Sequence, residues 1–310
     1  MPDSTPVRAL ELFCGIGGFA AATEGSNVSV AAACDFDDTA LAAYRLNFPG
    51  HTALKRDLQA AGAWELCRHA AGLWWLSPPC QPYCERGARR DIDDQRAASL
   101  LNIISLLERV DRSSLPPNLA LENVEGFTDS RARDLLRAAL TGRGYACHER
   151  MLCPTSLGIP SRRPRYYLTA SLAAPPAPPP LPPTTAEPLA AYLCDTSAGH
   201  PELLLNPRHL ERFAPGLRII DPHDAAAVTT CFTSGYGKSV MAAGSYLATP
   251  WGVRLFSPGE VMLLLGFPAR YRFPEPLSLK RRWSLAGNSL SVAAVREVLR
   301  SFPWFRPAAG

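Results

Sequence analysis

The chain has 310 residues, 47% hydrophobic and 19% charged, so it can bury a sizeable core as one large domain or two smaller ones. Its 9 cysteines are scattered without a C-x-x-C pair, which argues against a zinc site or disulfide framework and favours a reducing cytoplasm. No apolar run approaches the roughly 18 residues of a membrane span, and residues 1–10 lack a signal-peptide pattern, so we expect a soluble, unexported protein. A formal net charge of +4 is too small to indicate a polyanionic partner.

A glycine turn follows the first predicted strand, residues 7–12, and precedes an Ala-rich helical stretch. This order is typical of the start of a doubly wound α/β sheet, where glycines let the backbone approach a nucleotide. A second strand, residues 29–34, ends at Asp35, at a distance from Gly15 that suits hydrogen bonds to ribose hydroxyls. The pattern fits NAD as well as S-adenosylmethionine, and Asp35 can instead be a helix N-cap.

The next acid follows a predicted helix, residues 39–48, and a short strand around Leu54. Asp57 stands at the end of that strand, where a carboxylate can reach the amino group of an adenine. The alternative, which fits nearly as well, is that Asp57 is a solvated aspartate in a surface loop.

A stiff loop, residues 77–83, follows the apolar strand of residues 73–76 and holds Cys80 between a proline pair and a Gln-Pro step. An open α/β sheet keeps its reactive groups at such strand ends, although an incidental buried thiol is the simpler interpretation. The polar, basic residues 83–90 are of the kind that closes over a substrate. Helix 94–110 carries a 3.6-period apolar face and is expected to be core scaffold.

A third strand-end acid, Glu122, follows the predicted strand of residues 118–121 and is expected in the same crevice as Cys80. The alternative is that Glu122 forms a salt bridge on the protein surface. A helix at 131–140 and strands at 145–152 and 166–170 complete the α/β alternation.

A proline-rich linker, residues 173–186, divides the chain. We expect a catalytic domain at 1–172, a small target-recognition module at 187–251, and a C-terminal segment at 252–310 that returns to the catalytic domain. The segment contains a strand and helix within 252–267 and a final helix from Val292.

Read together, these loops resemble the ordered motifs of the cytosine carbon-5 methyltransferases. The motif residues are 13–19, 78–81, 122–124, 163–165, Arg254 with Glu260 and 266–268, and 287–289. The resemblance implies a doubly wound, Rossmann-like domain that binds S-adenosylmethionine, with a small recognition module. The implied cofactor-binding residues are Phe13, Cys14, Gly15, Ile16, Gly17, Gly18, Phe19, Asp35, Phe36, Asp57, Leu58, Pro79, Asn288 and Ser289.

The same resemblance implies covalent catalysis, because carbon 5 of cytosine is a poor nucleophile until a thiolate adds to carbon 6. Cys80 is the implied nucleophile and Glu122 the acid beside ring N3. Arg163 and Arg165 are expected to bind the ring carbonyl oxygen and a nearby phosphate.

Within the family, the chain is most similar to the branch that methylates transfer RNA, through residues 231–237 and 122–127. This implies a cytoplasmic, monomeric tRNA (cytosine-5)-methyltransferase acting on nucleotide thirty-eight of the anticodon loop in aspartate or glutamate tRNA. The alternatives are a DNA cytosine methyltransferase of a restriction-modification system and an inactive RNA-binding relative. The implied substrate-binding residues are Gln81, Tyr83, Asn123, Cys231, Phe232, Thr233 and Tyr236.

Overall fold

The computed structural model describes residues 6–84, 89–181, 183–194 and 201–308. The chain divides into two compact units. The first unit is Met1–Leu152, Pro164–Pro180 and Val295–Gly310, and the second unit is Cys153–Arg163 and Leu181–Ala294. Within the described ranges, every helix is too short or too polar to cross a bilayer.

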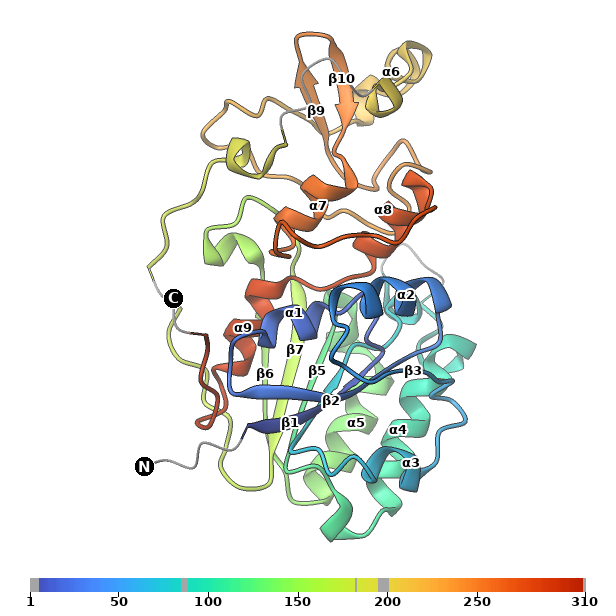
Figure 1. Ribbon diagram of the computed structural model, residues 1–310, viewed down its shortest axis with the longest axis vertical. Helices are drawn as coiled ribbons and strands as arrows, with labels where there is room; N and C mark the ends of the chain where they lie inside the picture. The colour runs from blue at the N-terminus through green and yellow to red at the C-terminus, as the bar shows by residue number, and fades with distance from the viewer. Residues whose placement is uncertain (1–5, 85–88, 182, 195–200, 309–310) are drawn as a thin grey trace. The chain divides into compact units, whose positions relative to one another are not determined.

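The first unit is built on a sheet with the order β3-β2-β1-β4-β5-β7-β6 among its described strands (Figure 1). All neighbouring pairs are parallel except those of β7, which runs antiparallel to β5 and β6. The strands are β1 (Val7–Leu12), β2 (Val28–Asp35), β3 (Ala53–Lys55), β4 (Leu73–Leu76), β5 (Asn118–Val124), β6 (Ala146–Leu152) and β7 (Arg165–Ser171). This arrangement confirms the predicted α/β fold.

The central strands of this sheet are buried along their length, which explains their continuous apolar sequences. All four residues of β4 are buried, and Phe19 stacks on Trp75 with ring centroids 5.1 Å apart. The register pairs Leu76 of β4 with Leu121 of β5. The residues that follow these two positions, the Cys80 loop and Glu122, therefore emerge side by side.

Helices cover the sheet and position its loops. They are α1 (Gly18–Thr23), α2 (Asp38–Asn47), α3 (Ala63–Cys67), α4 (Ala98–Arg109), α5 (Arg131–Gly142) and α9 (Val292–Leu299). Figure 1 shows α4 and α5 side by side, and Leu100, Ile103 and Leu107 of α4 are fully buried, as the predicted apolar face requires. Ser130 caps α5 by accepting a hydrogen bond from the amide of Arg133.

The second unit contains a small sheet with the order β10-β9-β8. Its strands are β8 (Ile219–Ile220), β9 (Tyr246–Thr249) and β10 (Gly252–Leu255), and its helices are α6 (Pro207–Phe213), α7 (Pro258–Leu264) and α8 (Leu279–Gly287). Ser257 and Glu260 form a capping box at the start of α7. Glu260 also accepts two hydrogen bonds from Arg254, at 2.8 and 2.7 Å, so this buried pair fixes β10 to α7.

The boundaries of these units differ from the predicted division. Residues 252–294, which we expected to return to the catalytic domain, group with the second unit, and only Val295–Gly310 groups with the first. Residues 153–163 also belong to the second unit, although they precede the proline-rich linker. The strand predicted at 118–121 extends to Val124, while β8, β9 and α8 were not predicted.

Candidate active site

The glycine turn after β1 is closed by backbone hydrogen bonds. The Cys14 amide donates to Cys34 at 3.0 Å, and the Gly17 amide donates to Cys14 at 2.9 Å. Gly17 has φ of 88°, and a Cβ there would lie 2.4 Å from the Phe48 ring. Gly15 has φ of 52° and faces open space, because a Cβ there would meet nothing within 4 Å. Only glycine suits both positions well, and Gly15 leaves its side of the turn accessible.

Asp35 holds this turn from the end of β2. Its Oδ2 accepts a 2.7 Å hydrogen bond from the Gly15 amide, and its Oδ1 accepts one of 2.9 Å from the Asp37 amide. Burial raises the pKa of Asp35, although these backbone donors oppose the shift. The N-cap of α2 is Asp37, which accepts from Thr39 and Ala40. The helix-cap interpretation of Asp35 is therefore wrong.

Most of the other predicted cofactor residues have buried side chains. Ile16, Phe19 and Leu58 lie in the core, as does Cys14, so a ligand can meet them only through the backbone. Gly18 opens α1 and is also buried, whereas Phe13 and Pro79 are half-buried. Phe36 differs from all of these, since 70% of its side chain is exposed beside Asp35.

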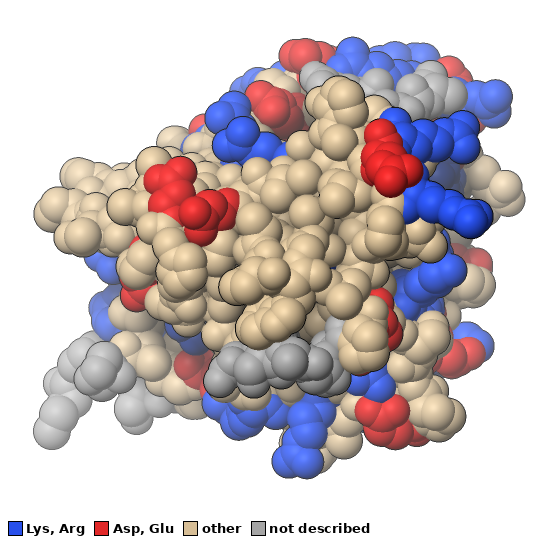
Figure 2. Space-filling model, turned by 90° about the horizontal axis from the view of Figure 1, so that it is seen from above, with Lys and Arg blue, Asp and Glu red and all other residues tan. Residues whose placement is uncertain are grey.

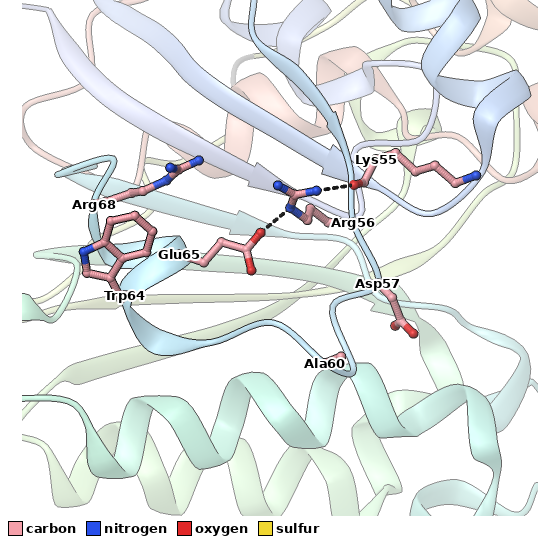
Figure 3. Close-up of a pocket in the computed structure, with 7 residues that line it drawn as sticks. All are labelled: Lys55, Arg56, Asp57, Ala60, Trp64, Glu65 and Arg68. Atoms are coloured by element: carbon pink, nitrogen blue, oxygen red, sulfur yellow. Dashed lines mark hydrogen bonds and ion pairs between the residues drawn. The ribbon is translucent and has the colours of Figure 1, made fainter.

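Asp57 is exposed and accepts a 2.9 Å hydrogen bond from the Gln59 amide. It borders a pocket of about 500 Å³ between the end of β3 and α3, whose other lining residues are Lys55, Arg56, Ala60, Trp64, Glu65 and Arg68. Figure 3 shows the Arg56 and Glu65 side chains paired inside this pocket, with Asp57 pointing away from Trp64. The carboxylate of Asp57 therefore remains open to solvent.

Glu11, which the sequence interpretation missed, lies beneath the glycine turn. It is only 1% exposed, its Oε2 accepts a 3.0 Å hydrogen bond from the Tyr44 hydroxyl, and its Oε1 has no partner among the described residues. Burial raises the pKa of Glu11 to about 8. The sequence signal that could have identified Glu11 is its place as an acidic residue in the otherwise apolar part of β1, because buried strands rarely contain a carboxylate.

The Cys80 loop is anchored to both neighbouring strands. The Ser77 amide donates to Leu12 at 3.2 Å, and Asn123 of β5 donates from Nδ2 to the Pro78 carbonyl at 3.3 Å. The Oδ1 of Asn123 accepts from the Val124 amide, so both ends of this buried amide are occupied. Asn123 therefore holds the loop in place, rather than offering the free amide expected of a substrate-binding residue.

Glu122 and Arg165 form a partly buried ion pair next to this loop. The register places Arg165 of β7 opposite Val124, and its Nε lies 3.2 Å from Oε1 of Glu122. Glu122 is 7% exposed. The charges of both residues influence the pKa of the Cys80 thiol, Arg165 lowering it and Glu122 raising it. The structure thus brings together three of the four predicted catalytic residues.

Cys80 also has a second thiol as a neighbour. Cys80 and Cys84 stand at the two ends of a single 3-10 turn, Gln81–Tyr83, and a hydrogen bond joins their side chains. This bond, followed by burial, raises the pKa of Cys80, whereas the same bond lowers the pKa of Cys84. The Cys84 hydrogen bond and burial therefore both oppose formation of the Cys80 thiolate. Residues 85–88 of the predicted closing segment lie outside the described residues.

Arg163, the fourth predicted catalytic residue, belongs to the second unit. Its guanidinium is buried and donates to backbone carbonyls and to the sulfur of Cys231, all within that unit. Arg165 pairs with Glu122 and Arg163 does not, so the two arginines differ in their contacts, and their roles towards the cytosine stay predictions.

Several predicted substrate-binding side chains are core residues. Tyr83 is buried edge-on against Phe127 with ring centroids 4.8 Å apart. In the second unit, Phe232 is 4% and Tyr236 is 1% exposed. Their rings pack 4.9 Å apart, and the Tyr236 hydroxyl donates to Ser245 at 2.6 Å. The large apolar area of these rings is buried in the core, so the side chains contribute to packing, and their role in substrate binding stays a prediction.

The remaining predicted residues keep some exposure or lie in the second unit. Gln81, Cys231 and Thr233 are half-buried. Asn288 is exposed and follows the last turn of α8, and Ser289 is buried. Neither caps α9 as expected of a helix start, because the hydroxyl that accepts from the first turn of α9 belongs to Ser291.

Comparison with known proteins places these features in context. Residues 7–188 match the family model of C-5 cytosine-specific DNA methylase. The chain is 30% identical to a Bos taurus tRNA (cytosine(38)-C(5))-methyltransferase, over 95% of this chain and 98% of the relative. The crystal structure of S. pombe Dnmt2 methyltransferase is similar with a TM-score of 0.84 and 26% identity, over 95% of this chain and 97% of that one. A methyltransferase from Entamoeba histolytica, EhMeth, shares the fold with a TM-score of 0.84 at 23% identity, over 96% and 97% of the two chains.

Proposed function

The chain belongs to the C-5 cytosine-specific DNA methylase family, and from this premise we propose that it methylates carbon 5 of cytosine thirty-eight in a transfer RNA. The choice of RNA is supported by the Bos taurus relative, whose name states this reaction and whose similarity extends over 95% of the chain. The observation that carries the chemistry is the grouping of Cys80 with the Glu122 and Arg165 ion pair at the ends of β4 and β5.

The residues around the glycine turn fit S-adenosylmethionine, the methyl donor of this family. Gly15 leaves room for close approach, and backbone amides, including those of Gly15 and Asp37, occupy part of the about four lone-pair sites on the Asp35 carboxylate. A remaining site can accept a hydrogen bond from a ribose hydroxyl. Phe36 offers an exposed ring for the adenine. When bound, the cofactor supplies an electrophilic methyl group.

The chemistry on the cytosine begins with Cys80. Its thiolate forms a bond to carbon 6, and the electron pair displaced from the ring makes carbon 5 nucleophilic. Glu122 supports this step by sharing a proton with ring N3, which carries the developing charge. Arg165 orients Glu122 through the 3.2 Å contact and lies near enough to Cys80 to favour its thiolate. Once carbon 5 carries the methyl group, a base removes the carbon 5 proton, and the released electron pair re-forms the carbon 5–carbon 6 double bond as the bond to the Cys80 sulfur breaks.

A target in an anticodon loop suits a small recognition module. A base must leave its stack to reach Cys80, and this costs less in a loop than in a duplex. The second unit also carries Lys280 and Arg281 on α8, which favour a polyanion, whereas the neighbouring Arg282 pairs with Glu275. Figure 2 shows Lys and Arg gathered toward the margins of the face seen from above, around a centre with few charges.

The decisive experiment uses tritiated S-adenosylmethionine with unmodified aspartate and glutamate tRNA transcripts. We expect label in at least one tRNA, and none when uridine replaces cytosine thirty-eight. Cys80→Ala is the matched protein control, and it should abolish labelling while binding S-adenosylmethionine normally. Strong labelling of duplex DNA alone would instead identify a DNA methyltransferase, and tRNA binding without turnover would identify an inactive relative.

A further inference from the structure

Arg163 was expected to touch a substrate, but both of its terminal nitrogens make hydrogen bonds within the chain, and only its buried Nε has no partner among the described residues. Its side chain is 4% exposed. Nη1 donates to the Phe232 carbonyl at 3.1 Å and to the Cys231 sulfur at 3.3 Å. Nη2 donates to the Gly287 carbonyl at 3.1 Å and to the Ser289 carbonyl. Both terminal nitrogens are therefore occupied inside the second unit.

These acceptors belong to two segments that are distant in sequence but in direct contact. A Cβ placed on Gly287 would lie 2.3 Å from the backbone carbon of Thr233, so the two backbones touch. Residues 231–233 form one side of this junction and residues 287–289 form the other. The planar guanidinium spans the junction with one terminal nitrogen on each side, a geometry that a lysine ammonium cannot reproduce.

The backbone before Arg163 is attached to the same segment. The Thr229 amide donates to the Pro160 carbonyl at 2.9 Å, and the Arg162 amide donates to the Thr229 carbonyl at 2.8 Å. This short parallel pairing ends at Arg162, and the side chain of Arg163 continues the attachment to Phe232. The Arg163 amide itself donates to the Cys153 sulfur at 3.3 Å. Residues 153–163 are thus held along 229–232.

The charge of Arg163 gives these contacts their importance. Its described hydrogen-bond acceptors are all uncharged, so the buried cation depends on the full set of carbonyl and sulfur acceptors for its stability. A substrate phosphate or ring carbonyl would have to displace them to reach the terminal nitrogens.

We propose that Arg163 is a positioning residue that fixes residues 231–233 against residues 287–289, and so sets the surface with which the second unit recognises tRNA. The half-buried Thr233 lies in the fixed segment, and the exposed Lys238 lies a short distance after it in the sequence. This inference rests on the proposed tRNA substrate. Arg165, which contacts Glu122, keeps the role of the catalytic arginine.

The test compares Arg163→Lys with Arg165→Lys and with Arg162→Met, which alters an exposed neighbour. Loss of part of the bridge should raise the KM for tRNA about 10-fold in Arg163→Lys, with kcat and the Kd for S-adenosylmethionine nearly unchanged. Arg165→Lys should mainly lower kcat, and Arg162→Met should resemble the wild type. A loss of kcat without a change in KM for Arg163→Lys would overturn the proposal.

Two further measurements guard against ambiguous results. Hydrogen exchange of the amides of residues 231–239 should be faster in Arg163→Lys than in the wild type, and equal rates would refute the positioning role even if tRNA is not the substrate. If Arg163→Lys does not fold, Cys231→Ala removes one acceptor only. It should raise the KM for tRNA by about 3-fold with kcat unchanged, and a selective loss of kcat would again contradict the proposal.

Discussion

Replacing Asp35 by alanine tests the cofactor site most directly, because the same carboxylate shapes the glycine turn and is expected to bind ribose. Asp35→Ala removes the acceptor for the Gly15 amide at 2.7 Å and for the Asp37 amide at 2.9 Å. It also removes the lone pairs left for the ribose hydroxyls. The turn should therefore lose both its anchor and its ligand contact.

The magnitude follows from the hydrogen bonds that are lost. A hydrogen bond to a charged group contributes about 1.5–3 kcal/mol, so the loss of one ribose contact alone should weaken S-adenosylmethionine binding about 10-fold to 150-fold. Asp35→Asn should behave more like alanine than like aspartate. An amide has one acceptor oxygen, whereas Gly15 and Asp37 donate to two different oxygens.

Asp37→Ala provides a matched control two residues away. Asp37 caps α2 through Thr39 and Ala40, so its removal should cost about 1 kcal/mol of stability. Its side chain accepts hydrogen bonds from the Thr39 and Ala40 amides, and the Kd for S-adenosylmethionine should stay near that of the wild type. Isothermal titration calorimetry measures the Kd, and thermal unfolding measures the stability of each variant.

The outcomes separate the two roles of these aspartates. If Asp35→Ala leaves the Kd unchanged, Asp35 is a structural residue of the turn and the ribose assignment is wrong. If Asp35→Ala and Asp37→Ala weaken binding equally, the effect comes from general loosening of the segment after β2, and the specific hydrogen-bond argument fails.

Three other perturbations follow from the site. Glu11 has an ordinary pKa of 4.5 and a folded pKa of about 8, so its contribution to stability is fully present below pH 4.5 and is lost as pH rises towards 8. As the pH rises from 4.5 to 7, the free energy of unfolding of Glu11→Gln should therefore increase by about 3 kcal/mol relative to that of the wild type, as measured by urea unfolding. A difference between the two proteins that does not change with pH would contradict this. Cys84→Ala should speed alkylation of Cys80 at pH 8, measured by mass spectrometry, because the hydrogen bond that most raises the Cys80 pKa is lost. Glu122→Gln should lower kcat about 100-fold to 10,000-fold in single-turnover assays, with the Kd for S-adenosylmethionine unchanged. If S-adenosylmethionine binding weakens as much as kcat falls, the variant is misfolded.

The order of strands, turns and acids was readable from the sequence because each is a local signal. The apolar run of β4, the glycines after β1 and the apolar face of α4 mark their own conformations. The short strands β8 and β9 carry no comparable pattern. β8 pairs with β9, which lies far away in the sequence, so no local window contains that pair, whereas β9 pairs with β10 across the short turn at residues 250–251.

Arg163 and Arg165 show where the sequence alone reaches its limit. Their spacing and their place ahead of β7 identified both as site residues, and the sequence by itself determined the family motif to which they belong. Only the tertiary structure decided their different contacts. Arg165 opens β7, so strand register directs it to Glu122, whereas Arg163 ends a segment paired with Thr229 and is directed to Phe232. Two residues of one motif thus serve different units, because each side chain follows the backbone pairing of its own segment.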